Sequence, residues 1–232
     1  MGHRRTDGWR CTMTKRKSVR IAEETLPVAE REPRAPVEAI RAAAFAQFAE
    51  RGYPVVTVRD IMKACGLTQG ALYNHFKSKD ELLHDIITST QGELERLCQQ
   101  AVAGVGDDPR AKLAAFVRVY VMRHCRMRIE ALVANREIGW LDATRVADIR
   151  RSRRAIRDIL VTILRQGVEG GVFDPPQVDG RSDLKAIAMA LLDQCTHISM
   201  WYGPGGDFGE EQMAKLYVEM ALRAVGAKPQ SV

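Results

Sequence analysis

The stretch from residue 57 to residue 76 constrains the fold more than any other part of the chain. It reads TVRDIMKACGLTQGALYNHF and places two apolar stripes with helical spacing on either side of Gly66. Glycine readily adopts the left-handed conformation that a tight turn between helices needs. Thr57 and Thr68 stand where the two helices would begin, and their hydroxyls can cap free backbone N–H groups. The stretch therefore predicts two short helices joined by a glycine turn.

The second of these helices is more polar on its outer side than a core helix. Leu72 and Phe76 are four residues apart and are expected to hold it against the core. An ordinary helical hairpin with a hydrated face is one interpretation. The other is a helix-turn-helix whose second helix enters the major groove of DNA, where amides pair with base edges. The residues expected to face outward are Gln69, Gly70, Ala71, Tyr73, Asn74 and His75.

Residues 57–83 closely resemble the DNA-binding headpiece of the tetracycline-repressor (TetR) family. The resemblance combines the glycine turn, the run LYNHF at 72–76 and the helix start SKDE at 78–81 in one register. Residues 40–52 are similar to the first helix of that family. The resemblance is strong over residues 36–85; elsewhere it lies mainly in the succession of helices.

The resemblance implies that this headpiece binds double-stranded operator DNA. It implies contacts to bases or flanking phosphates from Gln69, Gly70, Ala71, Tyr73 and Asn74, with Thr68 at the start of the reading helix. It also implies contacts to the DNA backbone from Thr57, Arg59, His75 and Lys79.

Charge is unevenly distributed along the chain, whose formal net charge is +6 at pH 7. Residues 1–35 hold nine Lys and Arg against five Asp and Glu, and residues 36–80 hold six against four. The remaining 152 residues hold twenty of each. The excess of positive charge thus lies in residues 1–80, the part of the chain that would contact the phosphate backbone of DNA. The basic residues 15–17 would either follow the minor groove or remain solvated.

Helical spacing continues along the rest of the chain, and no strand pattern competes with it. We therefore expect an all-α fold of about nine helices. After the first helix and the two of the motif, helices are expected over residues 78–103, 109–126, 128–140, 142–169, 182–202 and 210–225. Three parts follow: a disordered basic arm (1–35, with Met13 as an alternative start), a helix-turn-helix domain (36–82), and a ligand-binding and dimerisation domain (83–228).

Several classes of protein are disfavoured by what the sequence lacks. No apolar run approaches the roughly 18 residues of a membrane span, so we expect a cytoplasmic protein without membrane contact. The five cysteines are odd in number and lack metal-ligand spacing, which favours buried, reduced thiols over a redox sensor. Motifs typical of hydrolases, nucleotide-binding enzymes and metalloenzymes are missing, so neither catalysis nor a cofactor or metal is expected.

The larger domain is neutral overall, and its scattered Met, Trp, Tyr and His residues suit either an ordinary core or a lined cavity. The family resemblance implies an inducer pocket here. Polar residues such as Asp193 and His197, on a stripe with Met189, would be unusual in a plain core. The candidate ligand-binding residues are Phe116, Tyr120, His124, Arg136, Trp140, Met189, Asp193, His197 and Trp201.

The resemblance also bears on the ligand. Residues 201–206 (WYGPGG) and the glycines around 167–171 are similar to a subgroup that regulates fatty-acid or sterol breakdown and senses acyl-CoA thioesters. Arg150, Arg154 and Arg157 share one helix face, which would either meet CoA phosphates or form a solvated stripe. A large apolar inducer, with an acyl-CoA favoured, is therefore expected. The alternatives are a lipophilic cation in a regulator of efflux, and a DNA-binding protein without a ligand.

A two-fold assembly is expected because operators read by one helix-turn-helix per subunit are commonly palindromic. The last helix carries an apolar stripe that, with the preceding helix, would form a homodimer interface as in family members. Its residues are Met213, Leu216, Tyr217, Met220 and Ala224.

Overall fold

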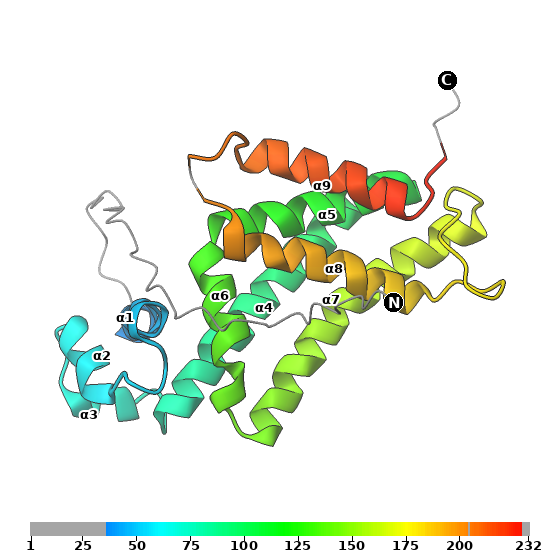
Figure 1. Ribbon diagram of the computed structural model, residues 1–232. Helices are drawn as coiled ribbons and strands as arrows, with labels where there is room; N and C mark the ends of the chain where they lie inside the picture. The colour runs from blue at the N-terminus through cyan, green and yellow to red at the C-terminus, as the bar shows by residue number, and fades with distance from the viewer. Residues whose placement is uncertain (1–35, 204, 229–232) are drawn as a thin grey trace, which may run out of the picture. The chain divides into compact units, whose positions relative to one another are not determined.

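The computed structural model describes residues 36–203 and 205–228, and this part of the chain is built of helices (Figure 1). An isolated β-bridge between Val178 and Arg181 is the only extended pairing within it. The expected all-α fold is thus confirmed. The elements in order are α1 (Pro36–Arg51), α2 (Val58–Ala64), α3 (Gln69–Tyr73), α4 (Lys79–Ala103), α5 (Pro109–Arg126), α6 (Arg128–Arg136), the 3-10 helix η1 (Glu137–Trp140), α7 (Ala143–Glu169), α8 (Leu184–Trp201) and α9 (Glu210–Ala224).

The two helices of the motif begin as predicted, but only one of them is capped by a side chain. Thr57 and Asp60 form a reciprocal capping box at the start of α2. Thr68 precedes α3 without making a side-chain cap, so its predicted capping role is wrong. Gly66 has a φ of 69°, the left-handed conformation expected of the turn.

Apart from shifts of one or two residues at helix ends, the structure differs from the sequence-based prediction in three features. Helix α3 ends at Tyr73 rather than reaching Phe76, although Phe76 is buried as expected. The single helix predicted over 128–140 is divided into α6 and η1. The pattern Ser78-x-x-Glu81 predicts a capping box at the start of α4, but only half of it forms. Ser78 accepts from the backbone N–H of Glu81, whereas the Glu81 carboxylate accepts from the backbone N–H of Lys77 and not from that of Ser78.

The buried residues form two apolar clusters that meet along α4. The first joins the headpiece helices to the start of α4 and includes Leu82, Leu83 and Ile87. The second fills the larger domain and takes Leu94 and Cys98 from the same helix. Val133 of α6 belongs to the headpiece cluster, so α6 contacts the headpiece directly. One continuous helix therefore connects both cores.

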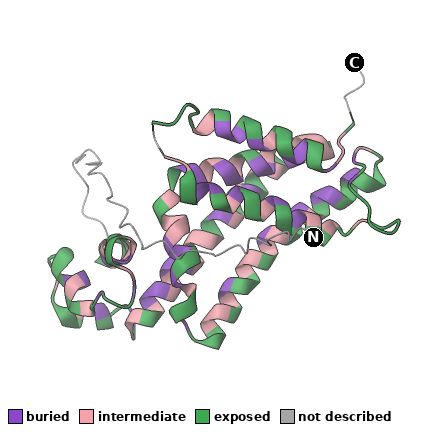
Figure 2. Ribbon diagram, in the orientation of Figure 1, coloured by how far each residue is buried: buried purple, intermediate pink, exposed green. Residues whose placement is uncertain are grey.

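Helix α5 is the central element of the larger domain. It packs against α4, α7, α8 and α9, and α9 runs along it in Figure 1. Its buried residues include Phe116, Tyr120 and His124, which point into the domain. Buried residues gather where these helices meet, and exposed residues cover much of the outer sides (Figure 2). No helix in residues 36–203 and 205–228 is long and apolar enough to cross a membrane.

The cysteines of the described residues are free thiols. Cys98, Cys125 and Cys195 are buried and Cys65 is half-buried. Burial raises the pKa of Cys98 and Cys195 to about 12, so both remain protonated near neutral pH. This agrees with the expected role as small apolar residues. Cys11 and the predicted basic arm lie outside the described residues, as does Met13.

Candidate functional site

The outer face of α3 presents polar side chains to solvent. Tyr73 is 60% exposed, and a side-chain carbon at Gly70 would meet nothing within 4 Å. Within residues 36–203 and 205–228, nothing hydrogen-bonds to the amides of Gln69 or Asn74. These amides are therefore free to pair with base edges. The remaining predicted residues on this face are the exposed His75 and Thr68 and the half-buried Ala71.

Some of the residues predicted to contact the DNA backbone already form hydrogen bonds within the headpiece, and others do not. Arg59 is exposed, and no carboxylate of the described residues pairs with it. Thr57 donates from its hydroxyl to the Asp60 carboxylate, 2.8 Å away, so that hydroxyl is already committed to the cap. Arg59 is thus a free cation beside the reading helix, whereas Thr57 is chiefly structural.

Lys79 has an internal role that its sequence position does not reveal. Its ammonium donates to the carbonyl oxygens of Tyr53 at 3.0 Å and Val56 at 2.8 Å. It also lies 4.1 Å from the centre of the Tyr53 ring, while the Tyr53 hydroxyl bonds to Asp80. Lys79 therefore fixes the loop between α1 and α2 on the start of α4, and one of its three N–H groups remains for another partner.

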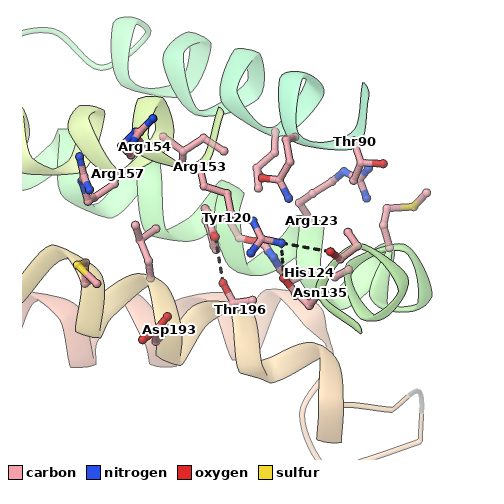
Figure 3. A pocket seen from close by; sticks show the side chains of 18 residues that line it. Thr90, Tyr120, Arg123, His124, Asn135, Arg153, Arg154, Arg157, Asp193 and Thr196 are labelled. Atoms are coloured by element: carbon pink, nitrogen blue, oxygen red, sulfur yellow. Dashed lines mark hydrogen bonds between the residues drawn. The ribbon is translucent and has the colours of Figure 1, made fainter. Parts of the chain in front are cut away.

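A cavity of about 280 Å³ lies inside the larger domain, between α4, α5, α6, α7 and α8 (Figure 3). Four of the predicted ligand-binding residues border it: Tyr120, His124, Met189 and Asp193. Two arginines of the predicted α7 face, Arg154 and Arg157, border it as well, whereas Arg150 does not. The other lining residues are Thr90, Gln91, Leu94, Arg123, Met127, Ala131, Ala134, Asn135, Arg153, Ile156, Leu192 and Thr196.

Aromatic rings stack along the α5 wall of the cavity. The ring of Tyr120 lies between those of Phe116 and His124, with centroids 5.9 and 4.5 Å away and interplanar angles of 19° and 20°. The Tyr120 hydroxyl shares a 3.0 Å hydrogen bond with Thr196 of α8. Burial raises the pKa of Tyr120, so the phenol keeps its proton. This wall is mainly aromatic.

Four arginines border the cavity, and they differ in how their charge is balanced. Arg123 pairs with Glu93 and Glu130, and Arg157 pairs with Asp158. Arg153 donates to the Ala134 carbonyl oxygen and to Oδ1 of Asn135, which are both neutral groups.

Arg153 and Arg154 have no carboxylate partner among the described residues. Burial lowers the pKa of Arg153, which marks the cost of holding its charge there. Asp193 is the one carboxylate among the described lining residues. The two arginines without a carboxylate partner are thus accompanied by a single carboxylate in the cavity lining.

Five of the predicted ligand-binding residues do not line the cavity. Phe116 is 1% exposed and lies behind Tyr120 in the core. Arg136 donates to the Phe48 carbonyl oxygen of α1, 2.8 Å away, and pairs with buried Glu137. Trp140 and Trp201 are 56% and 60% exposed, and His197 is exposed on the outside of α8. The four-residue spacing identified the correct helices but, for these residues, not the side that the cavity occupies.

Sequence reasoning missed several lining residues for an identifiable reason. Thr90 and Gln91 belong to α4, and nothing in the sequence of that helix indicates that one side of it borders a cavity. Arg123 directly precedes His124 and therefore lies off the stripe of Phe116, Tyr120 and His124 from which the cavity side of α5 was predicted. Arg153 is four residues before Arg157, so the same spacing rule applied to α7 would have included it.

The predicted dimer face contains residues of two kinds. Met213 and Tyr217 are buried at 5% and 9% exposure and belong to the core of their own subunit. Leu216 and Met220 are each 41% exposed, and Ala224 is exposed. The apolar stripe available on α9 is therefore narrower than predicted. Helix α8 adds exposed Met200 and Trp201.

Comparison with known proteins identifies the family. Residues 40–86 match the family described as "Bacterial regulatory proteins, tetR family", and residues 106–225 match "Tetracyclin repressor-like, C-terminal domain". Over 178 residues the chain is 30% identical to the HTH-type transcriptional repressor KstR2 of Rhodococcus jostii, covering 75% of this chain and 83% of that protein. The chain belongs to the TetR family of DNA-binding transcriptional regulators.

Solved structures show the same fold. A regulatory protein of the tetR family from Rhodococcus RHA1 superposes with a TM-score of 0.75 at 29% identity, over 83% of this chain and 98% of that one. AibR, whose structure is in complex with isovaleryl coenzyme A and operator DNA, superposes with a TM-score of 0.71 at 23% identity, over 83% of this chain and 99% of that one. At that identity the likeness to AibR concerns the fold.

Proposed function

We propose that this chain is a repressor that binds operator DNA as a homodimer and is released from it by an acyl-CoA. Contacts to bases are assigned to the exposed face of α3, above all to the amides of Gln69 and Asn74. Contacts to phosphates are assigned to Arg59 and to the remaining donor of Lys79. The free amides and the free guanidinium support these assignments, because both groups lack partners within the described residues.

The observation that carries the ligand proposal is the pair Arg153 and Arg154, which border the cavity without a carboxylate partner. Arg153 is half-buried, and a half-buried cation without a counter-charge is costly, so an anionic ligand would remove that cost. Arg154 is exposed and adds a hydrated positive charge at the border of the cavity. The phosphates of CoA supply such charge and pair well with guanidinium groups. A lipophilic cation is disfavoured, because Asp193 is the one lining carboxylate beside two arginines without a carboxylate partner among the described residues, and Glu137 lies outside the cavity.

The size of the cavity indicates how such a ligand would divide between protein and solvent. A volume of about 280 Å³ lies at the lower end of the range for small-molecule pockets. It suits the acyl part, whereas the CoA group would lie outside, over α7. In Figure 3, Arg154 and Arg157 lie together at one side of the cavity, where they would meet the phosphates.

Release from DNA requires that the ligand prefer a conformation in which the two reading helices no longer match the groove spacing, roughly 34 Å. Helix α6 offers a direct connection. Ala134 and Asn135 border the cavity, while the next residue, Arg136, holds the Phe48 carbonyl oxygen of the headpiece. A ligand that displaces Arg153 from Ala134 and Asn135 would act at the same end of α6.

The test is a release experiment. Operator duplexes are first selected from random double-stranded DNA with the full chain. The complex is then titrated with acyl-CoAs of several lengths and with cationic dyes, and fluorescence anisotropy reports release. Acyl-CoAs are expected to release the DNA and dyes are not. The Arg154→Gln variant should need about tenfold more ligand, the loss of roughly one charge-assisted hydrogen bond.

The matched control is Arg165→Gln, an exposed arginine of the same helix that does not border the cavity. It should leave the release curve unchanged. Release by dyes alone would contradict the acyl-CoA proposal. If neither acyl-CoAs nor dyes release the DNA, the proposed ligand class is wrong, and the proposed DNA binding is unaffected.

A further inference from the structure

His124, in the inner wall of the cavity, offers a hydrogen-bond acceptor that the protein itself does not use. Its Nδ1 lies 2.8 Å from the Tyr120 carbonyl oxygen, one helical turn earlier. A carbonyl oxygen only accepts hydrogen bonds, so the proton of the neutral ring is on Nδ1. Nε2 therefore carries a lone pair and acts as an acceptor.

The environment of His124 keeps the ring neutral. The residue is 7% exposed, and its ring is stacked on that of Tyr120. Burial lowers the pKa of His124 to about 4, and the neighbouring positive charge of Arg123 acts in the same direction. The ring is thus an acceptor, and not a cation, throughout the physiological pH range.

Nε2 of His124 is open to the cavity. None of residues 36–203 and 205–228 hydrogen-bonds to this atom. Within that part of the chain, Nε2 of His84 is the one side-chain polar atom that is both fully buried and unpartnered. Nε2 of His124 therefore retains accessible surface, and His124 borders the cavity. An acceptor in the wall of a cavity favours a ligand that brings a hydrogen-bond donor. A bound ligand without a donor would leave Nε2 without a partner, and this costs free energy.

We propose that His124 is a specificity-determining residue that selects ligands with a hydroxyl group at the end buried in the cavity. A ligand hydroxyl would donate to Nε2 of His124. It would also accept from Nδ2 of Asn135, which borders the same cavity and whose Oδ1 is occupied by Arg153. A carbonyl has no proton to give Nε2, and an ammonium group would be repelled by the arginines. A hydroxyl matches both groups without adding positive charge.

The position of His124 indicates which part of the ligand bears this hydroxyl. Figure 3 shows His124 and Asn135 together, away from Arg154 and Arg157. If the CoA group lies over these arginines, the hydroxyl belongs near the far end of the acyl chain. Only this placement rests on the proposed acyl-CoA; the choice of a hydroxyl rests on His124 itself.

The test measures the preference between ligands that differ by one hydroxyl. Calorimetric Kd values of the full chain are obtained for dodecanoyl-CoA and 12-hydroxydodecanoyl-CoA, and for the two corresponding free acids. The hydroxylated member of a pair is expected to bind about fivefold more tightly, the net contribution of roughly one hydrogen bond. In the His124→Phe variant, which retains a stacked ring without the acceptor, this ratio should fall to about one.

The chain contains a matched control in His197. It makes the same Nδ1 contact, 2.8 Å from the Asp193 carbonyl oxygen one turn earlier, but it is exposed and does not border the cavity. His197→Phe should retain the parent's preference. Thermal unfolding and circular dichroism of both variants show whether they remain folded.

The outcomes separate this inference from the proposed function. Equal binding of both members of every pair by the parent chain overturns the role of His124, even if acyl-CoAs bind. If the preference for the hydroxylated ligand is seen only with the free acids and is lost in His124→Phe, the role of His124 is supported and the acyl-CoA proposal is contradicted. An unchanged preference in His124→Phe also overturns the inference, and binding of none of the four ligands overturns both.

Discussion

At the scale of single residues, the partners of an arginine decide whether it has a structural role or is available to a ligand. Arg136 is held by Glu137 and the Phe48 carbonyl oxygen and so joins α6 to the headpiece. Arg154 has no such partner in the described part of the chain, and it borders the cavity. The sequence shows the two arginines but not their partners, which come from other helices. For this reason residue type alone assigned Arg136 to the ligand site.

The lowered pKa of His124 predicts a pH dependence of stability. The pKa of His124 in the folded chain is about 4, against an ordinary value of 6.5 for histidine. Between these values the unfolded chain binds more protons, so the free energy of unfolding falls as the pH is lowered from about 6.5 to about 4. Above pH 6.5 this contribution is fully present. Its size is about 3 kcal/mol, to order of magnitude.

The measurement is urea unfolding of the parent and of His124→Phe at pH 7 and pH 4.5, at one protein concentration because a dimer's stability depends on it. The parent should lose roughly 2 kcal/mol more than the variant between the two pH values. His197→Phe serves as the control and should behave as the parent does. Parallel losses in the parent and His124→Phe would contradict the buried, neutral histidine.

At the scale of elements, the helices were predictable because each has its own apolar spacing and its own start and stop signals. Pro109 begins α5, and the expected bounds of that helix are those observed. The division between α6 and η1 was not predictable, because Glu137 is buried there through its pairing with Arg136 and packing against other elements. The lining face of each helix was only partly predictable, since it depends on which neighbours leave a gap.

Helix α3 and the start of α2 yield a prediction about DNA binding. Gln69→Ala removes a free amide and should relax the sequence preference at one base pair, a loss of about 1–3 kcal/mol of discrimination. Arg59→Ala removes a free cation and should weaken binding to all sequences, with the slope of log K against log salt lowered by about 0.9.

Both DNA-binding variants are compared by titrating selected and scrambled duplexes at several salt concentrations. Gln99→Ala is the control, because Gln99 is an exposed amide on α4, away from the reading helix. Lys79→Ala is less suitable as a first test. Its two bonds to carbonyl oxygens mean that it should also destabilise the headpiece. If Gln69→Ala still distinguishes selected from scrambled duplexes as well as the parent does, residues other than Gln69 contact the bases.

At the scale of the whole molecule, the sequence predicted two functional regions and the structure shows how they are joined. Charge counting and the glycine turn located the headpiece. The connection through α6 was not visible, because it depends on Val133 and Arg136 contacting the headpiece while Ala134 and Asn135 border the cavity. Four consecutive residues thus face both regions, a property of packing rather than of sequence pattern.

The last prediction concerns the homodimer. Leu216 and Met220 of α9 and Met200 and Trp201 of α8 are large apolar side chains that remain exposed in the single chain. Burial of such side chains between subunits would stabilise a dimer. Met220→Glu should therefore shift the protein to monomers by light scattering and reduce operator binding about 100-fold or more, because two headpieces must act together.

A glutamate placed on another side of α9 is the control for the dimer prediction. Lys215→Glu alters an exposed residue next to the apolar stripe in sequence but on a different face of the helix. It should leave the protein dimeric, whereas Tyr217→Ala should destabilise each subunit, since Tyr217 lies in the core. Circular dichroism separates these effects: Met220→Glu should keep its helicity while it loses its partner. If Met220→Glu stays dimeric, α9 does not form the interface, and the exposed side chains of α8 become the next surface to change.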